Sequence, residues 1–494
     1  MARNPATSAY LIMALLMLAR LFFAAVPPLG VDETYAVAAA RGFSLSFFDH
    51  PPVAFNAALL SSVIVGVETP FVFRIPTLLF GAVALWMMWR IGCLLGGERV
   101  GLWTVALYAA SPAFALSGAF IVPDAPLNMA AAICVYWLVR IAQSDRPAPL
   151  SYWVWVGLAL ALALASKYQA ALIPVMALAF ALFTRTGRSW FAQPGPYVAS
   201  ILGLVGLLPV LLWNIANDWA SFSFHTARTG DGINLDNFAL MQAGQILYLL
   251  PPIAVLAVMG LWRTAASRPE SAQLLLWLIA MGPIVLFNIV YLFSNKSFPH
   301  WTMLGWMFAL ILTAQMIAGG TDRLQRRARA WVTGFAVVVF GAVAMLAIHL
   351  QTGVLTRFTH DRPPAWDRTW DAFDYSGLRG ELEARDLLDG VGIIAARSWI
   401  QAAYISTALQ GDYAVKILRG SPHHFPYLEG ADATGPALLL TPDVLGRESW
   451  SDEKLLDLAR ATDPNAELLK PIVLQRGGLD YVSVSVIRMS FDAH

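Results

Sequence analysis

Ionisable side chains that could take part in a reaction lie in the polar segments between the apolar stretches of this sequence. In chain order they are Asp32, Glu33, Asp49, His50, Asp124, Lys167, His225, Arg228, Lys296 and His300. Ionisable groups close to a membrane cost free energy unless they pair or line a wet cavity, so each is a candidate functional residue. Carboxylates can act as a general base or bind a cation, and lysine and arginine can hold a phosphate. This mixture suits the transfer of a group from a phosphate ester.

The composition predicts that most of the chain is embedded in membrane lipid. Of the 494 residues, 58% are hydrophobic and 13% are charged, whereas a soluble globular protein carries about 25% charged residues. The formal net charge of +1 gives no excess that would indicate nucleic acid as a partner. Cys93 and Cys134 both fall in apolar stretches. They therefore indicate neither a disulfide framework nor a cysteine-based metal site.

Apolar stretches near the length of about 20 residues that crosses a bilayer recur along the first two thirds of the chain. The first could be mistaken for a signal peptide, but the many later stretches favour a retained helix. Together they predict a mainly α-helical, polytopic membrane protein with about eleven spanning helices. The predicted spans are 8–26, 71–94, 100–118, 125–142, 152–166, 169–184, 197–213, 239–262, 273–293, 300–318 and 331–350.

Arginine and lysine are distributed unevenly between alternate loops. One set of loops is rich in arginine and includes the cluster Arg323, Arg326, Arg327 and Arg329. Because cytoplasmic loops carry an excess of basic residues, we expect this set to face the cytoplasm. The candidate functional residues lie in the opposite set of loops. They therefore share the outer side of the membrane.

The last part of the chain is predicted to be a soluble domain. After residue 350, "VGIIAA", "YAVKIL", "ALLLTP" and "LDYVSVSVIR" indicate strands, and "SWIQAAYISTAL" and "SDEKLLDLARA" indicate helices. This predicts a small α/β domain over 351–494, after a membrane domain over 1–350 whose first outer loop spans 27–70. The domain has no glycine-rich phosphate loop. We interpret its pair His423 and His424 as an ordinary turn rather than a metal site.

Motifs along residues 10–320 resemble a known family. They are "DETYAVAAARGFSLSFFDHPPV", "FRIPTLLFGA", "FIVPDAPLNM", "ASKYQAAL", "PVLLWNIANDWASFSFHTAR" and "SFPHWTMLGW". In this order they resemble the polytopic GT-C glycosyltransferases of the ArnT-like and protein-mannosyltransferase group, and especially the bacterial subgroup that includes galacturonosyltransferases acting on rhizobial lipopolysaccharide. Each motif alone is weak, whereas the combination is specific.

The resemblance implies a GT-C fold and an inverting glycosyltransferase. Such enzymes take a sugar from a polyprenyl-phosphate carrier and pass it to a lipid, a glycan or a protein. The expected location is the bacterial inner membrane, with the active site and the C-terminal domain in the periplasm. Lipid A or lipopolysaccharide core is the favoured acceptor, and the protein is expected to be a monomer.

The resemblance also implies roles for the residues of the first outer loop. Asp32 matches the acidic residue that activates the acceptor hydroxyl, although an aspartate here could also cap the following helix. Glu33 is a second catalytic candidate that tunes the site, or else a first-turn helix residue. Tyr35 is expected to contact substrate. Asp49 would help to bind a divalent cation, Mg²⁺, Mn²⁺ or Zn²⁺, with His225 as a second ligand.

Basic residues are expected to hold the donor phosphate. They are His50, Lys167, Arg228 and Lys296. His50 stands where the aminoarabinose transferases carry a lysine, which leaves its phosphate contact open and would make activity sensitive to pH. The alternatives are a proline-stiffened turn for the "DHPP" stretch and a side chain that reaches the membrane interface for Lys167.

Four further residues are expected to contact substrate: Asp124, Tyr168, His300 and Trp301. Asp124 could instead cap a helix, and Trp301 could belong to the aromatic belt of the membrane interface. Two other functions are consistent with such a chain. A transporter or flippase would have a similar number of helices, but we find no internal repeat and the charges lie at one face rather than at the midplane. A non-catalytic scaffold is the third alternative.

Overall fold

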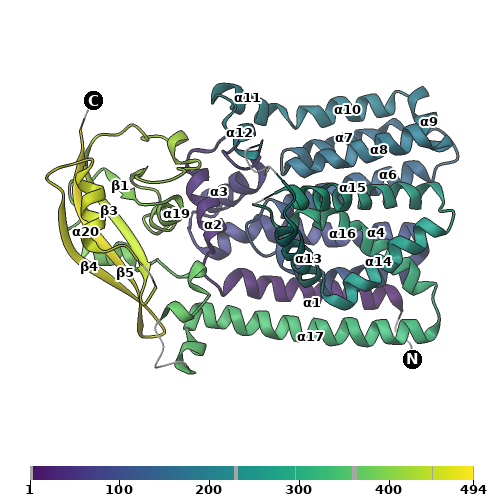
Figure 1. The fold of residues 1–494 in the computed structure, drawn as a ribbon. Helices are drawn as coiled ribbons and strands as arrows, with labels where there is room; N and C mark the ends of the chain where they lie inside the picture. Colours follow the sequence, from purple (N-terminus) through teal and green to yellow (C-terminus); the bar gives the residue numbers. More distant parts are fainter. Residues whose placement is uncertain (1–3, 227–231, 295, 359–363, 448, 493–494) are drawn as a thin grey trace. The chain divides into compact units, whose positions relative to one another are not determined.

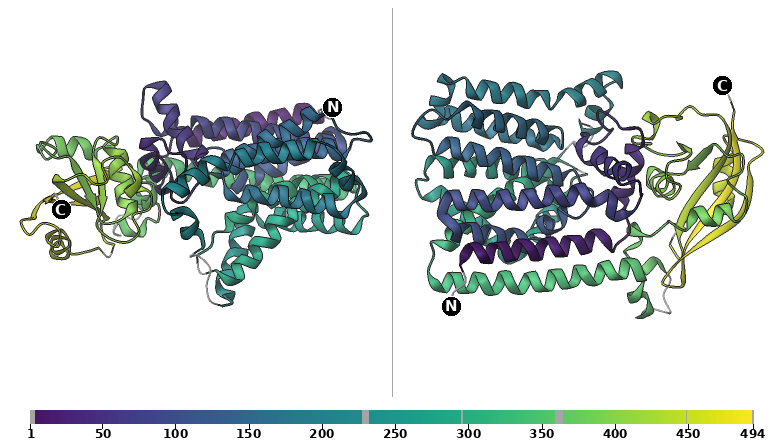
Figure 2. Two further views of the ribbon diagram at one scale, coloured as in Figure 1. Left: turned by 90° about the horizontal axis from the view of Figure 1, so that it is seen from above. Right: turned by 180° about the vertical axis from the view of Figure 1, so that it is seen from behind.

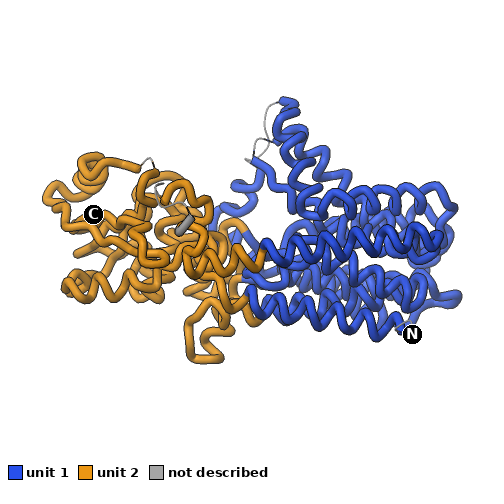
Figure 3. The backbone as a smooth tube through the Cα atoms, turned by 90° about the horizontal axis from the view of Figure 1, so that it is seen from below, with its two compact units in different colours: residues 1–23, 50–54, 76–342 blue, residues 24–49, 55–75, 343–494 orange. Residues whose placement is uncertain are grey.

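The computed structural model describes residues 4–226, 232–294, 296–358, 364–447 and 449–492 (Figure 1). The chain divides into two compact units (Figure 3). Unit 1 contains residues 1–23, 50–54 and 76–342, and unit 2 contains residues 24–49, 55–75 and 343–494. The first outer loop and the C-terminal region therefore belong mostly to the same unit. Arg228 lies outside the described residues.

Helices account for most of the first 352 residues, as the apolar stretches predict. Their bounds are α1 (Pro5–Ala25), α2 (Val31–Ala39), α3 (Val53–Val65), α4 (Pro70–Ala110), α5 (Pro112–Ser117), α6 (Asp124–Ala142), α7 (Leu150–Leu164), α8 (Leu172–Phe183), α9 (Arg185–Arg188), α10 (Gly195–Val205), α11 (Leu208–Ala216), α12 (Ala220–Thr226), α13 (Leu235–Leu249), α14 (Pro251–Ala266), α15 (Ser271–Phe293), α16 (Met303–Ala318) and α17 (Asp322–Thr352). Each predicted span overlaps at least one of these helices.

Among the described residues, seven helices are long and apolar enough to cross a membrane, or up to nine spans if each bent pair counts as one. Two features explain why the sequence predicts more. Helix α4 has 41 residues and holds two predicted spans, which are separated at Gly96 and Gly97. Gly97 has a φ of 74°, a left-handed conformation that glycine adopts without steric cost. Helix α7 has only 15 residues.

The helices of unit 1 pack side by side (Figures 1 and 2). Helix α7 packs against α6 and α10, and α15 packs against α8 and α16. A side chain at Gly206, which follows α10, would bring its Cβ atom to 2.1 Å from the carbonyl oxygen of Ala161. Small residues allow such close approach between membrane helices. Helix α16 is buried along nearly all of its length, so it forms the centre of the apolar core.

Arg20 is a fully buried cation inside the first span. An ionisable residue within a span is by default a functional candidate, but here the backbone satisfies it. Arg20 donates hydrogen bonds of 2.7 Å to the carbonyl of Phe114 and 2.9 Å to that of Ala115. These carbonyls belong to the short helix α5, whose last carbonyl groups have no partner within the helix. Arg20 therefore ties α1 to α5.

Unit 2 contains the predicted α/β domain. Its five strands are β1 (Ile393–Ala396), β2 (Ala414–Ile417), β3 (Gly435–Val444), β4 (Glu467–Arg476) and β5 (Leu479–Phe491), in the order β2-β1-β3-β5-β4. Strand β1 pairs in parallel with β2 and β3, and β5 pairs antiparallel with β3 and β4. The helices are α18 (Leu378–Glu383), α19 (Trp399–Ala408) and α20 (Asp452–Arg460).

Strand β4 was not identified from the sequence. It contains Pro471, and its register with β5 shifts between Leu469 and Ile472. Proline cannot donate a ladder hydrogen bond, so within sheets it occurs at edges and bulges. Because β4 lies at the edge of the sheet and is irregular at this proline, it tolerates a residue that argues against a strand when the sequence is considered alone.

Candidate active site

Helix α2 carries the first three candidate residues, and its start is fixed by Glu33. The Glu33 carboxylate accepts a 3.0 Å hydrogen bond from the Gly30 backbone N–H, which is one half of a capping box, since glycine has no side chain to supply the other half. Pro27 and Pro28 precede this turn. This bond satisfies a backbone donor at the start of the helix that the helix itself leaves unpaired. Glu33 therefore acts as the first-turn helix residue that the sequence offered as one alternative.

Glu33 also forms a buried salt bridge with Arg74 of the "FRIP" motif. Arg74 Nε donates to Glu33 Oε1 at 2.8 Å, and Arg74 Nη2 donates to Oε2 at 2.6 Å. The guanidinium further donates to the carbonyls of Ala24, Pro27 and Pro28 at 3.1, 2.8 and 2.8 Å. Arg74 is fully buried. Such a paired carboxylate is poorly suited to take a proton from a substrate, and its contacts hold the loop before α2 against the start of α4.

Asp32 has different surroundings. Its side chain is exposed to solvent, and the structure assigns it no hydrogen bond or salt bridge to any described residue. The surrounding protein partly desolvates the carboxylate, and the negative charges of Asp49, Glu33 and Asp371 lie close to it, so the pKa of Asp32 is raised. A raised pKa makes a carboxylate a stronger base. Asp32 is thus an accessible carboxylate of increased basicity that no described residue pairs with.

Asp49 is held by residues from distant parts of the chain. The Tyr35 hydroxyl donates a 3.1 Å hydrogen bond to Asp49 Oδ1, and His423 Nδ1 lies 3.9 Å from Oδ2. Tyr35 is buried, and its ring contacts the rings of Trp399 and His423 at centroid distances of 5.1 and 5.7 Å. Tyr35 thus orients Asp49; its predicted contact with substrate stays a prediction.

The two histidines of "SPHHF" belong to this site, which the sequence did not indicate. His424 is buried, and its Nδ1 atom accepts a 3.2 Å hydrogen bond from the Phe48 backbone N–H. Burial lowers the pKa of His424 to about 4, although the charge of Asp49 acts in the opposite direction. His423 has a φ of 51° and packs on Trp399 at 4.4 Å. The histidine pair was the available signal, but its partners lie more than 370 residues earlier.

A second group of polar residues lies in unit 1. Lys167 Nζ donates a 2.7 Å hydrogen bond to Asp124 Oδ2, and Lys167 is buried. His50 and His300 lie near enough to act electrostatically on the Asp124 carboxylate. Asp124 is the first residue of α6 and follows the cap residue Pro123. The structure thus brings together four predicted residues from four segments, and it pairs Lys167 inside the protein.

Tyr168 and His225 lie together in unit 1. The hydroxyl groups of Tyr168 and Ser221 are 2.9 Å apart, and the rings of Tyr168 and His225 have centroids 5.2 Å apart. Tyr168 directly follows Lys167 in the 3₁₀ helix η2 (Tyr168–Ala171). Its side chain therefore links η2 to helix α12, which carries His225. The predicted substrate contact of Tyr168 is untested.

Lys296 and Trp301 have contrasting environments. Lys296 is exposed. Trp301 lies in the 3₁₀ helix η4 (Pro299–Thr302), and its ring contacts those of Phe287 and Tyr291 at centroid distances of 5.7 and 6.2 Å. The aromatic neighbours are compatible with the interfacial alternative for Trp301. The phosphate-binding role of Lys296 and the substrate-binding role of Trp301 stay predictions.

The metal prediction has no cluster to support it within the described ranges. Those ranges contain no group of three or more His, Cys, Asp or Glu side chains that could hold a metal ion. Asp49 contacts Tyr35 and His423 in unit 2, whereas His225 contacts Tyr168 in unit 1. The pairing of Asp49 and His225 as metal ligands stays a prediction. We therefore derive no reaction step through a metal ion.

A buried polar network in unit 1 was also missed from the sequence. The side-chain oxygen of Gln245 accepts hydrogen bonds from the Thr302 hydroxyl at 2.8 Å and from the Trp306 indole at 2.9 Å. Gln245 is buried, and its amide nitrogen lies 3.3 Å from Asn288 Oδ1. Single amides in apolar stretches give little warning of such a network, because their partners lie on other helices.

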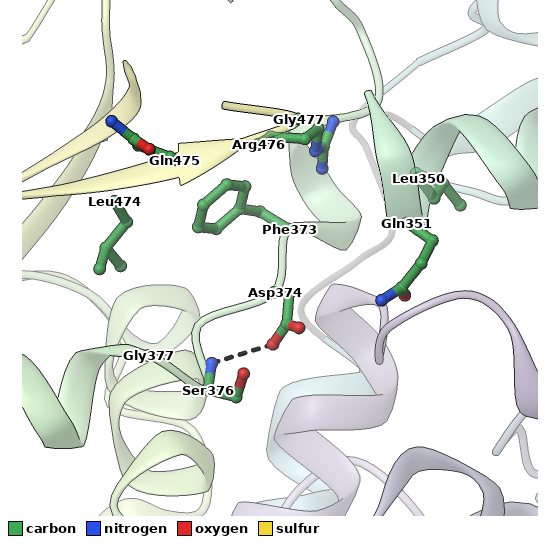
Figure 4. Close-up of a pocket in the computed structure, with 10 residues that line it drawn as sticks. All are labelled: Leu350, Gln351, Phe373, Asp374, Ser376, Gly377, Leu474, Gln475, Arg476 and Gly477. Atoms are coloured by element: carbon green, nitrogen blue, oxygen red, sulfur yellow. Dashed lines mark hydrogen bonds between the residues drawn. The ribbon is translucent and has the colours of Figure 1, made fainter. Parts of the chain in front are cut away.

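The described residues of unit 2 line at least two cavities. One, of about 220 Å³, is lined by residues that include Phe373, Asp374 and Arg476 (Figure 4). None of the predicted site residues lines it. The other, of about 430 Å³, is lined in part by Thr34 of α2 and Tyr404 of α19. Tyr404 also interacts electrostatically with Asp32, so this larger cavity lies close to the exposed carboxylate.

Solved structures of other proteins have a similar fold. ArnT from Cupriavidus metallidurans in the apo state is similar over 97% of this chain and 97% of its own, with 14% identity and a TM-score of 0.67. The same protein bound to undecaprenyl phosphate has the same coverage and TM-score, with 15% identity. The chain has a GT-C fold. The expected fold class, helical and polytopic with a small C-terminal α/β domain, is confirmed.

A sequence match supports the same conclusion. Residues 49–213 match the model of the family described as dolichyl-phosphate-mannose-protein mannosyltransferase. An oligosaccharyltransferase from Archaeoglobus fulgidus, in complex with Zn and sulfate, is similar over 87% of this chain and 67% of its own, with 10% identity and a TM-score of 0.51. None of the curated protein sequences compared with the chain matches it. The resemblance of the motifs to this group of proteins is thus matched by a family model over residues 49–213 and by the shared GT-C fold.

Proposed function

We propose that this GT-C protein transfers a sugar from a polyprenyl-phosphate-sugar donor to a hydroxyl group of an envelope lipid or glycan, with Asp32 as the general base. The observation that carries the proposal is the contrast within the first turn of α2. Asp32 is exposed and has a raised pKa, while Glu33 is occupied by Arg74. A general base must reach its proton and hold it transiently. Of the two carboxylates, only Asp32 meets this requirement.

The proposed reaction is a direct displacement. Asp32 takes the proton of the acceptor hydroxyl, and the hydroxyl oxygen forms a bond to the anomeric carbon of the donor sugar. The bond between that carbon and the phosphate oxygen breaks, and the polyprenyl phosphate leaves with the bonding electrons. The anomeric configuration inverts, and no covalent intermediate with the protein forms.

We propose that the polar group of unit 1 holds the leaving phosphate. Lys167 is a buried cation paired with Asp124, and His50 and His300 lie nearby. Cationic donors stabilise negative charge as it develops on a leaving group. ArnT, which shares the fold, is known bound to undecaprenyl phosphate. We assign donor-phosphate binding to Lys167 and His50, and keep Arg228 and Lys296 as further candidates.

The proposed location is the bacterial inner membrane, with the reaction at the periplasmic face. The uneven distribution of arginine between alternate loops supports this orientation. Lipid A, lipopolysaccharide core or another glycan is the proposed acceptor, and the cavity of about 430 Å³ bordered by Thr34 and Tyr404 could admit part of it. We propose that the protein acts as a monomer. The GT-C fold favours the enzyme over the transporter alternative.

The test compares cells that lack the protein with cells that express it or a variant. Mass spectrometry of their envelope lipids and glycans should show one sugar residue that is missing without the protein. Asp32→Asn should fail to restore that sugar although it is expressed and melts at the wild-type temperature. Asp389→Asn, which also removes an exposed carboxylate of unit 2, serves as the matched control and should restore it. Full restoration by Asp32→Asn would exclude Asp32 as the base.

A further inference from the structure

The C-terminal α/β domain presents three arginines just beyond the carboxyl ends of its three parallel strands. Arg397 follows β1 by one residue, Arg419 follows β2 by two, and Arg447 follows β3 by three. Strands β2, β1 and β3 are neighbours in the sheet. Because parallel strands end at the same edge, their side chains lie at one edge of this domain.

The topology makes this edge a binding position. The chain passes from β1 through α19 to β2 on one side of β1, and then crosses to β3 on the other side. In open α/β sheets, ligands bind outside the carboxyl ends of the strands where the strand order reverses. Strand β3 also extends beyond β1, because Ala395 pairs with Leu439 while β3 continues to Val444. The last residues of β3 therefore overhang the ends of β1 and β2.

Trp450 gathers three cations at this edge. The guanidinium carbons of Arg397 and Arg419 lie 5.3 and 4.7 Å from the centre of its ring, and Lys454 Nζ lies 4.4 Å from it. Cation–π contacts of this length are attractive. They hold together positive charges that would otherwise repel one another. We call these four residues the Trp450 cluster.

The Trp450 cluster carries more positive than negative charge among the described residues. Arg397 Nη2 donates a 3.1 Å hydrogen bond to Asp443. Arg397 Nη1 is buried and has no hydrogen-bond partner among the described residues. Arg419 and Lys454 are exposed and form no salt bridge with a described residue. A buried guanidinium nitrogen without an acceptor costs free energy. The exposed cations of Arg419 and Lys454 are the groups of the cluster that an anionic ligand can reach.

We propose that the Trp450 cluster binds an anionic saccharide, a sugar that carries a carboxylate or a phosphate. This inference rests on the proposed function, in which the acceptor is an envelope lipid or glycan. The bound group would be a part of the acceptor other than the reacting hydroxyl. Arginine suits this role because its planar fork matches carboxylate and phosphate oxygens. The arrangement around Trp450 fixes the cations before the ligand arrives, which lowers the entropy cost of binding.

Binding to the purified full-length protein in neutral detergent tests the proposal. The probes are trigalacturonate and glucosamine 6-phosphate, with neutral maltotriose as the uncharged control. Either anionic probe should bind at least ten-fold more tightly than maltotriose, and its affinity should fall as salt is added. Arg419→Gln combined with Lys454→Gln should weaken anionic binding at least ten-fold. Arg460→Gln combined with Lys470→Gln removes two other exposed cations of the domain and should leave binding unchanged.

Three outcomes would overturn the inference. They are equal binding of all three probes, unchanged binding in the Arg419 and Lys454 variant, and competition by short-chain phosphatidylglycerol without any binding of the sugars. The last outcome would assign the cluster to lipid headgroups. The readout is independent of the chemical step, because Asp32→Asn should bind the anionic probes normally. A result that excludes Asp32 as the base can therefore be distinguished from a result that excludes anion binding at the Trp450 cluster.

Discussion

Asp32 and Glu33 are consecutive residues of α2, yet their carboxylates have opposite environments. Both oxygens of Glu33 accept hydrogen bonds from the buried guanidinium of Arg74, at 2.8 and 2.6 Å. Asp32 is accessible to solvent, and partial desolvation by the surrounding protein, together with nearby negative charges, raises its pKa. One carboxylate therefore stabilises the structure and the other is available to a substrate. This division of roles makes the two residues experimentally separable.

Removing the negative charge of Glu33 should destabilise the protein. Glu33→Gln leaves Arg74 as a buried charge without its partner, which costs about 3–5 kcal/mol. A thermal melt of the purified protein in detergent should show a large drop in the melting temperature. Glu68→Gln is the matched control, because Glu68 pairs with Arg41 at a partly exposed position where such pairs contribute about 1 kcal/mol or less. Equal melting temperatures for the two variants would contradict the structural role of Glu33.

The rate of transfer should depend on the charge of Asp371. A raised pKa means that Asp32 becomes protonated, and loses its function as a base, at a higher pH than an ordinary aspartate does. Asp371 is one of the charges that raise this pKa. Asp371→Asn should lower the pKa of Asp32 and shift the acidic limb of the kcat/KM profile to lower pH. The pH profile of kcat/KM, measured with purified protein, checks this. A shift to higher pH, or none, would show that Asp32 does not control the limb.

Variants of Lys167 and Asp124 should distinguish a structural role of Lys167 from a role in donor binding. Lys167→Gln leaves the Asp124 carboxylate without its 2.7 Å partner and should reduce both stability and transfer. The double variant Lys167→Gln/Asp124→Asn removes both charges and should recover much of the stability. If Lys167 holds the donor phosphate, the KM for the polyprenyl-phosphate donor stays raised in the double variant. A recovered donor KM would make Lys167 purely structural. Kinetics at varied donor concentration and thermal melts provide the two readouts.

Acid should destabilise the protein through His424. The pKa of His424 is about 4 in the folded protein, where the side chain is buried, and 6.5 when it is not buried. Between these two pH values the unfolded chain therefore binds more protons than the folded protein does. The contribution of His424 to the free energy of unfolding is fully present above pH 6.5, and the free energy of unfolding falls by about 3 kcal/mol as the pH decreases to 4. His424→Gln keeps an acceptor for the Phe48 N–H and should lose less stability over this range. Melting temperatures at pH 7.5, 6 and 5 test this, and parallel curves for both proteins would contradict it.

The helical part of the fold could be predicted because it depends on local composition. A stretch of apolar residues forms a helix in a membrane, since no other local structure satisfies its backbone there. Every predicted span accordingly overlaps at least one helix. The prediction merged or divided spans where the chain has a local break, as at Gly96 and Gly97, and it missed β4, whose proline is tolerated only because the strand lies at an edge.

The candidate residues were found in the sequence because charge beside apolar stretches is rare and costly. Residue type and position were enough to select Asp32, Glu33, Asp49 and Lys167. They were not enough to divide the roles of Asp32 and Glu33, which depend on Arg74 about 40 residues later. Nor did they reveal that His423 and His424 meet Asp49 and Phe48.

The sequence by itself thus determined that most of the chain lies in a membrane, where its helices are and that a C-terminal domain follows them. It also determined which residues have side chains that could take part in a reaction. The tertiary structure decided which of these residues are paired, buried or exposed. The physical reason is that the free energy of moving a segment from water into the membrane depends on the composition of that segment alone. A salt bridge, a hydrogen bond or a shifted pKa depends on groups a few ångströms apart that the sequence separates by tens or hundreds of residues.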